Sequence, residues 1–144
     1  GLARVLKASE NQSSNQYDPM LDRLNRPTPR VALGLALRSV AHACIDVSDG
    51  LLADLNHILH SSGAGARLDL DAIPVADGAS TMQSITAGDD YELCFTAPAH
   101  RRDTVNELAR ALSLPITRIG MVTAQPGMVD QNNHPLTPTG YTHF

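Results

Sequence analysis

The segment CIDVSDGLLADL, residues 44–55, has three oxygen-bearing side chains among its four residues 46–49. Asp46 falls inside a short apolar run typical of a buried strand, Ser48 is a predicted helix N-cap, and Asp49 opens the helix that follows. We therefore expect two carboxylates and one hydroxyl to converge at the carboxyl end of a strand. In α/β layers this edge is the usual place for ligands.

The chemistry that suits these groups is the binding of a divalent cation. Two neighbouring carboxylates repel each other, and Mg²⁺ would remove that repulsion. Mg²⁺ prefers hard oxygen ligands and commonly takes one or two carboxylates together with phosphate oxygens and water. The alternative is that Ser48 and Asp49 only cap the helix, whose N-terminus favours an acidic residue, while Asp46 bonds to neighbouring backbone. The motif by itself leaves both interpretations open.

A second acidic group occurs in AGDDYEL, residues 87–93, directly before another predicted strand. Asp89 and Asp90 follow a glycine, so the backbone can turn sharply there and present both carboxylates to a ligand. Ordinary turn chemistry explains an aspartate after a glycine equally well. Two such groups beside core strands of one small domain favour a shared cation or phosphate site.

The apolar pattern predicts the elements that would position these groups. Residues 43–47 read as a buried strand, and the helix after it is predicted to end at Gly63. Other helices are predicted from Asp18, over 31–41 and over 99–112, and other strands over 66–71, 91–98 and 117–124, with a short hairpin in 126–135. Helices and strands mix without strict alternation, which indicates an α+β fold of three layers, α/β/α, with a mixed sheet.

Length and composition limit the class of protein. The chain has 144 residues, enough for one compact domain, with 42% hydrophobic and 18% charged residues, as in soluble globular proteins. The net charge is −4 and the eleven Lys and Arg residues are scattered, so we expect no nucleic-acid partner. No apolar run reaches the ~18 residues of a membrane span and no signal peptide is recognisable, so we expect no membrane partner and a cytoplasmic location.

Other sites for metals or nucleophiles are not indicated. Cys44 and Cys94 are fifty positions apart in strand-like runs and are predicted to be buried, reduced thiols. His57 and His60 have a spacing that could share a metal, but the apolar stripe of their helix points the other way, so we expect both to be solvated. No GxxxxGK[ST] loop and no nucleophilic triad can be identified.

Five motifs, in order, resemble the C-terminal half of the bacterial thiamine-monophosphate kinase family, within the superfamily of aminoimidazole ribonucleotide synthetase. They are RLNRPTPRV, CIDVSDGLLADLNHI, GAGARLDLDAIPV, AGDDYELCFTAP and GYTHF. The resemblance spans nearly the whole chain. It implies an enzyme that transfers a phosphoryl group from ATP to thiamine monophosphate, with thiamine diphosphate as product and Mg²⁺ ions as cofactors.

The resemblance also implies roles for single residues. Asp46 and Asp49 would be magnesium ligands and Ser48 a contact to ATP. Asp89 would face the thiamine phosphate, and Tyr141 would be the aromatic residue near the C-terminus that lies against the substrate.

Two residues of the motif AGDDYELCFTAP depart from the pattern of the family. Asp89 stands where the family more often has glutamate in Gly-Gly-Glu-Asp-Tyr-Glu-Leu, and Ala87 replaces the first glycine. The aspartate side chain is shorter by one methylene, so its reach toward the substrate is reduced.

The resemblance further implies that an N-terminal domain is missing. Residues 1–17 would be a linker from that domain and 18–144 the C-terminal domain, which begins where the family's metal-rich N-terminal domain ends. We expect homodimerisation through the missing domain and no turnover by this chain alone. The alternatives are a stand-alone binding or assembly module of the same fold without catalysis, and another ATP-dependent member such as a selenophosphate synthetase.

Overall fold

The computed structural model describes residues 26–75, 78–88 and 90–140. The described helices are α3 (Val31–Leu37), α4 (Leu51–Ser62), α5 (Thr81–Thr86) and α6 (Arg102–Ala111), the last preceded by a 3₁₀ turn, η1 (Ala99–Arg101). The described strands are β1 (Ala43–Val47), β2 (Gly65–Leu68), β3 (Glu92–Thr96), β4 (Gly120–Thr123), β5 (Gly127–Val129) and β6 (Pro135–Leu136). The helix predicted from Asp18 lies outside the described residues.

The strands form two sheets. β1 and β3 make an antiparallel pair in which Ile45 lies opposite Cys94 and Asp46 opposite Leu93. The other sheet has the order β4-β2-β5-β6, with β2 antiparallel to β4 and parallel to β5. β5 and β6 are antiparallel, so the short hairpin predicted in residues 126–135 is confirmed.

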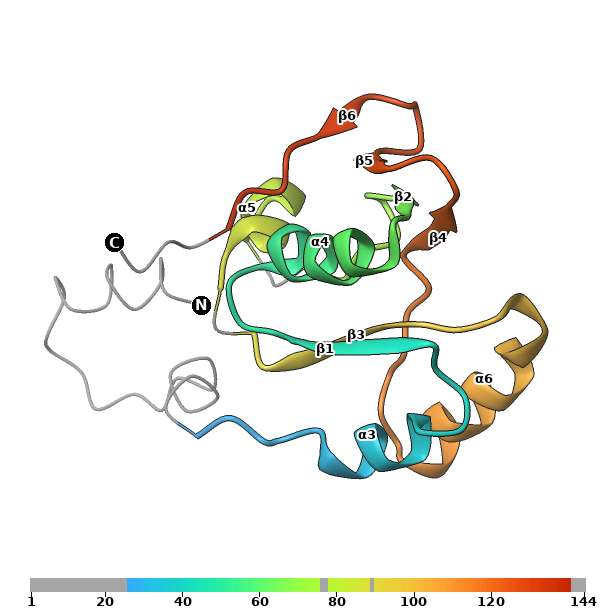
Figure 1. Cartoon of the computed structure of the whole chain (residues 1–144). Coiled ribbons are helices and arrows are strands. Elements are labelled where there is room, and N and C mark those ends of the chain that lie inside the picture. The colour runs from blue at the N-terminus through green and yellow to red at the C-terminus, as the bar shows by residue number, and fades with distance from the viewer. Residues whose placement is uncertain (1–25, 76–77, 89, 141–144) are drawn as a thin grey trace, which may run out of the picture.

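One face of the β1–β3 pair is covered by α3 and α6 (Figure 1). Their contact is a hydrophobic cluster built on Leu33, Leu37 and Val40, with Leu93 and Phe95 of β3 packed against it. Apolar residues of α6 and of the segment after it complete the cluster: Val105, Leu108, Leu112, Leu114 and Ile116. The stripe predicted for residues 31–41 is therefore the packing face, although the helix itself ends at Leu37.

The main core lies on the other face of the pair, around α4. Figure 1 shows α4 between the β1–β3 pair and the four-stranded sheet. The cluster contains residues of α4, of both sheets and of α5: Val47, Leu52, Leu55, Leu59, Ala66, Leu68, Ile85, Cys94 and Met128. α4 has 12 residues, and no helix among those described is long and apolar enough to cross a membrane.

The α+β class and the mixed sheet are confirmed. The α/β/α layers are formed by α3 with α6, the β1–β3 pair, and α4. The mixed sheet packs on α4 as a separate layer, which the order of elements along the chain did not predict. The α4 stop was predicted correctly, because Gly63 adopts the left-handed conformation at the C-cap with φ 59°.

Helix α5 was not predicted. Its N-cap is Ser80, whose hydroxyl accepts the backbone N–H of Gln83, while the Gln83 side chain accepts the backbone N–H of Ser80. This reciprocal arrangement is a capping box, and the spacing Ser-x-x-Gln was its signal in the sequence. Ile85, the fully buried residue of this short helix, anchors it to the main core.

Candidate functional site

The turn between β1 and α4 carries the first predicted site residues. Asp46 is exposed in β1, on the opposite face from Ile45 and Val47, which enter the core. Ser48 and Asp49 are half-buried in the turn that follows. The prediction that Ser48 is the N-cap is wrong, because α4 begins after Gly50, whose φ of 120° suits glycine and whose cap makes no side-chain hydrogen bond.

The turn is held instead by a buried carboxylate of α4. Asp54 is 3% exposed, and its Oδ2 accepts the backbone N–H of Ser48 at 2.9 Å and that of Asp49 at 3.0 Å. Ser48 is therefore not the N-cap residue of α4, and the turn is fixed through the backbone N–H groups of Ser48 and Asp49. Their own N–H groups are capped, by a residue that the sequence analysis did not select.

A sequence signal for Asp54 did exist. It lies three residues after Leu51 and four before Ile58, within the apolar face of the predicted helix. A charged residue inside an apolar stripe is buried only when it has partners, so its position required nearby donors. The N–H groups of the preceding turn are the donors that the structure provides.

Glycines bring two other segments against the same turn. A Cβ atom on Gly88 would collide with the carbonyl oxygen of Ser48, and one on Gly140 would lie 2.6 Å from the carbonyl oxygen of Asp49. Gly50 packs in turn against the backbone of Thr86, 3.0 Å from where its Cβ would stand. The turn is therefore in backbone contact with the segment before β3 and with the C-terminal segment.

These contacts bear on the two predicted substrate residues. Asp89 and Tyr141 lie outside the described residues, but each follows directly in the chain from a glycine that touches the turn, Gly88 or Gly140. On the other side of Asp89, the Tyr91 N–H donates to the carbonyl oxygen of Val47 at 3.0 Å. Gly88, Tyr91 and Gly140, which flank the two undescribed site residues in the chain, therefore lie at the carboxyl end of β1 and the turn that follows it.

A small cavity lies beside this region. It has a volume of about 110 Å³ and is lined by Pro27, Thr28, Arg30, Asp90 and Tyr91. Arg30 donates to Glu92 through Nε at 2.8 Å and through Nη2 at 2.7 Å. Tyr91 has a positive φ of 53°, a conformation that non-glycine residues rarely adopt. The NRPTPR motif and the GDDYEL motif are therefore joined in space, although sixty-two positions separate Arg30 from Glu92.

The donor set of the turn suits a magnesium ion only in part. Asp46 and Asp49 can supply carboxylate oxygens, the kind of ligand that Mg²⁺ takes one or two of from a protein. No group of three His, Cys, Asp or Glu side chains suited to a metal occurs among residues 26–75, 78–88 and 90–140. A cation at this turn would therefore need further ligands from phosphate, water or another part of the protein.

Histidines and cysteines contribute little to this site. His57 and His60 are exposed on α4, as predicted. Cys94 is buried, also as predicted, and burial raises its pKa to about 11. The prediction for Cys44 is wrong, because it is exposed in β1. Cys44 lies opposite Phe95, on the face where α3 and α6 pack, but their cluster does not cover it, and the periodicity of a short apolar run could not reveal this.

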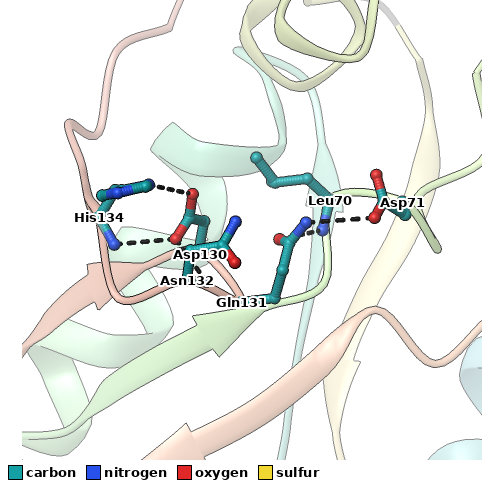
Figure 2. A network of polar contacts seen from close by, with 6 residues as sticks. All are labelled: Leu70, Asp71, Asp130, Gln131, Asn132 and His134. Carbon is teal, nitrogen blue, oxygen red and sulfur yellow. Dashed lines mark hydrogen bonds and ion pairs between the residues drawn. The ribbon is translucent and has the colours of Figure 1, made fainter.

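Another polar network, drawn in Figure 2, supports the β5–β6 hairpin. Asp130 is 8% exposed and accepts the backbone N–H groups of Asn132 and His134, both at 2.8 Å, while its Oδ2 lies 3.1 Å from His134 Nδ1. Gln131 joins the hairpin to the loop after β2, accepting the Leu70 N–H at 3.1 Å and donating to Asp71 at 3.3 Å. These bonds satisfy the turn's own backbone, so the network is structural.

Comparison with known families matches residues 2–131 to the family described as AIR synthase related protein, C-terminal domain. Among curated proteins, the chain is similar to the thiamine-monophosphate kinases of Salmonella typhimurium, at 41% identity, and of Escherichia coli K12, at 36%. Both alignments cover all of this chain and 48% of the relative. The chain therefore spans about half the length of the curated relatives it matches.

Solved structures show the same fold. Thiamine-monophosphate kinase from Stenotrophomonas maltophilia K279a superimposes with a TM-score of 0.80 at 42% identity, over 90% of this chain and 45% of that one. AaThiL complexed with AMPPCP and TMP superimposes with a TM-score of 0.78 at 27% identity, over 98% of this chain and 46% of that one. Because the family match extends over nearly the whole chain and relatives share its architecture, the chain belongs to the family of AIR synthase related protein C-terminal domains.

Proposed function

We propose that this chain is the C-terminal part of an ATP-dependent kinase that phosphorylates thiamine monophosphate to thiamine diphosphate. The observation that carries the proposal is the similarity, over the whole chain, to thiamine-monophosphate kinases at 36–41% identity. A structural neighbour was solved with AMPPCP, an ATP analogue, and TMP, which supports both substrates. Within the described residues, the turn at 48–50, which Asp54 holds through two backbone N–H groups, is the element that would meet the nucleotide phosphates.

In this proposal Asp46 and Asp49 hold Mg²⁺ and Ser48 contacts ATP. The exposed carboxylate of Asp46 and the fixed backbone of the turn support these roles. Bound Mg²⁺ would neutralise phosphate charge. Because Asp54 already accepts the N–H groups of Ser48 and Asp49, the turn would meet the nucleotide with side-chain oxygens rather than with backbone donors.

Asp89 and Tyr141 would bind thiamine monophosphate. Support comes from the contacts of Gly88 and Gly140 with the turn, since these contacts keep both chain segments close to the proposed nucleotide groups. Asp89 is one methylene shorter than glutamate, so we expect a weaker direct contact with the substrate phosphate than a glutamate would make.

The reaction itself requires little acid–base chemistry from the protein. A phosphate oxygen of thiamine monophosphate, already anionic at neutral pH, would form a bond to the γ-phosphorus of ATP. The bond from that phosphorus to the β–γ bridging oxygen would break, and ADP would leave. Catalysis would then depend on in-line positioning and on charge neutralisation, which carboxylates and a rigid turn can provide.

We also propose that residues 1–17 link this domain to an N-terminal domain, and that the latter supplies further metal ligands and the dimer contact. The boundary at residue 18 lies outside the described residues. In support, Asp46 and Asp49 belong to no group of three metal-binding side chains within the described part of the chain. The chain alone is then expected to be inactive.

The test uses the full-length product of the gene that encodes this chain. Phosphoryl transfer to thiamine monophosphate and the binding of Mg²⁺–ATP are measured for the unaltered protein and for Asp46→Asn and Asp49→Asn. We expect a loss of at least about tenfold in each variant, because each removes one carboxylate ligand. Asp103→Asn, an exposed carboxylate on α6, is the matched control and should change neither quantity.

Two results would overturn the proposal. Unaltered protein that binds Mg²⁺–ATP without transferring phosphate would favour the binding-module alternative. Normal affinity and turnover in both aspartate variants would show that Asp46 and Asp49 are not ligands.

A further inference from the structure

Helix α4 carries, directly after the β1–α4 turn, a carboxylate that has no direct role in the proposed chemistry. Asp54 is 3% exposed and sits in the first turn of α4, below Ser48 and Asp49. It cannot bind a nucleotide from this buried position. Its Oδ2 is instead the common acceptor for two consecutive backbone N–H groups, at 2.9 and 3.0 Å.

We propose that Asp54 is a positioning residue for the nucleotide site, and that its carboxylate sets the direction in which the side chains of Ser48 and Asp49 leave the turn. This inference rests on the proposed function. Two consecutive N–H groups that point to one oxygen restrict the peptide planes on both sides of Ser48. The side chains attached to those planes are then held in one orientation before any ligand binds.

The rest of the turn leaves no other place for these N–H groups. The carbonyl of Val47, in the peptide that carries the Ser48 N–H, accepts the N–H of Tyr91 at 3.0 Å. The carbonyl of Ser48, in the peptide that carries the Asp49 N–H, is packed against Gly88, so neither peptide can rotate without disturbing the segment before β3. Gly50 adds a third backbone contact, with Thr86. Asp54 therefore holds the N–H groups of a turn whose carbonyl groups are already fixed by neighbouring segments.

A charged acceptor is well suited to this role. Hydrogen bonds from neutral donors to a carboxylate are roughly twice as strong as bonds between neutral groups. Some side chains do not bind the metal but orient its ligands through hydrogen bonds. Replacing such a side chain typically lowers metal affinity or activity by roughly 10–100-fold. This is the size of effect expected here, without any contact between Asp54 and the ligand.

Three variants of the full-length gene product separate positioning from stability. Asp54→Asn keeps the shape and leaves Oδ1 as an acceptor for both N–H groups. Asp54→Leu has a similar size and no acceptor. Leu59→Ala removes a buried side chain, 3% exposed, five residues further along the same helix than Asp54, so it lowers stability without touching the β1–α4 turn.

The binding of Mg²⁺–ATP, measured by calorimetry well below the unfolding temperature, and its KM are compared among the three. We expect Asp54→Leu to lose roughly 10–100-fold in affinity. Asp54→Asn should stay within roughly threefold of the unaltered protein, since its amide oxygen replaces the carboxylate with bonds of about half the strength. Leu59→Ala should unfold at a lower temperature with unchanged KM.

Amide hydrogen exchange gives a readout that does not depend on activity. In this chain the Ser48 and Asp49 amides should exchange slowly, and both should exchange faster in Asp54→Leu than in Leu59→Ala. If the unaltered protein transfers no phosphate, the proposed function fails, and the exchange rates still decide whether Asp54 holds the turn. The inference is overturned if Asp54→Leu keeps normal exchange or normal KM, or if Leu59→Ala changes KM as strongly.

Discussion

Arg30 and Glu92 form a bidentate ion pair that joins the segment before α3 to the first residue of β3. Both oxygens of the carboxylate are used, one by Nε and one by Nη2 of the guanidinium. The hydrogen bonds that Arg30 donates to Glu92 raise the pKa of Arg30 above its usual value, against the opposing effect of partial burial. Arg30 also lines the small cavity, together with Asp90 and Tyr91.

Arg30→Lys is expected to lower the free energy of unfolding by about 1 kcal/mol, because an ammonium cannot make the two parallel bonds of the guanidinium fork. The estimate is kept small because both side chains are partly exposed to solvent, at 21% and 37%. Urea denaturation measures the change. Arg118→Lys is the control. It removes a single hydrogen bond, from Arg118 Nε to the Gly120 carbonyl, and should lower the free energy of unfolding by less.

A charge-reversed pair provides a second check on the same contact. Arg30→Glu alone places two carboxylates together and should destabilise the protein. Combining it with Glu92→Arg should recover part of the loss. No recovery would mean that the pair contributes through its packing rather than through its charges.

Gly88→Ala is expected to disturb the site, because its methyl group would collide with the carbonyl oxygen of Ser48. We expect a loss of stability of about 1–3 kcal/mol, the usual range for overpacking, together with faster amide exchange in residues 48–50. Thermal unfolding and hydrogen exchange measure both effects.

Gly34→Ala is the control for that prediction. Its new methyl group would lie 3.8 Å from the Leu93 side chain, an ordinary contact, in the middle of helix α3. Alanine should therefore stabilise the protein, by about 0.5–1 kcal/mol. Equal effects of the two substitutions would contradict the close approach at Gly88.

Asp130 should make stability depend on pH. Desolvation acts to raise the pKa of Asp130, but hydrogen bonds from the backbone N–H groups of His134 and Asn132 and from the His134 ring outweigh it, so the pKa lies below its usual value of 3.8. The stabilisation is then present above that usual value and is lost as the pH falls through the lower pKa of the folded state.

Acid titration of unfolding free energy measures this effect. Asp130→Asn should show a shallower loss of stability below about pH 4 than the unaltered protein does. His134→Ala should give an intermediate slope, because the two backbone bonds to Asp130 remain. Identical slopes in all three proteins would contradict the assignment.

The two cysteines should differ in reactivity. Cys44 is exposed on β1, whereas Cys94 is buried with a pKa raised to about 11. A thiol reagent at pH 8 should therefore modify one cysteine rapidly in the native protein and the second only after unfolding. Peptide mapping identifies the modified residue, and modification of Cys94 first would contradict the packing of the β1–β3 pair.

The sequence by itself determined the elements that depend on local patterns. The apolar stripe of residues 51–59, the glycine at 63 and the apolar runs around 43–47 and 92–96 predicted α4, its end and the β1–β3 strands. These predictions held because periodicity and capping act over a few residues. The acidic residues of the turn were visible for the same reason, since they are adjacent in the chain.

Only the tertiary structure decided how that turn is held. Asp54 accepts the N–H groups of Ser48 and Asp49, and Gly88 and Gly140 bring two distant segments to the same backbone turn. The exposure of Cys44 and the division of the strands into two sheets were decided at the same level. The physical reason is that burial and close backbone approach depend on which surfaces meet, and these surfaces come from residues far apart in the chain.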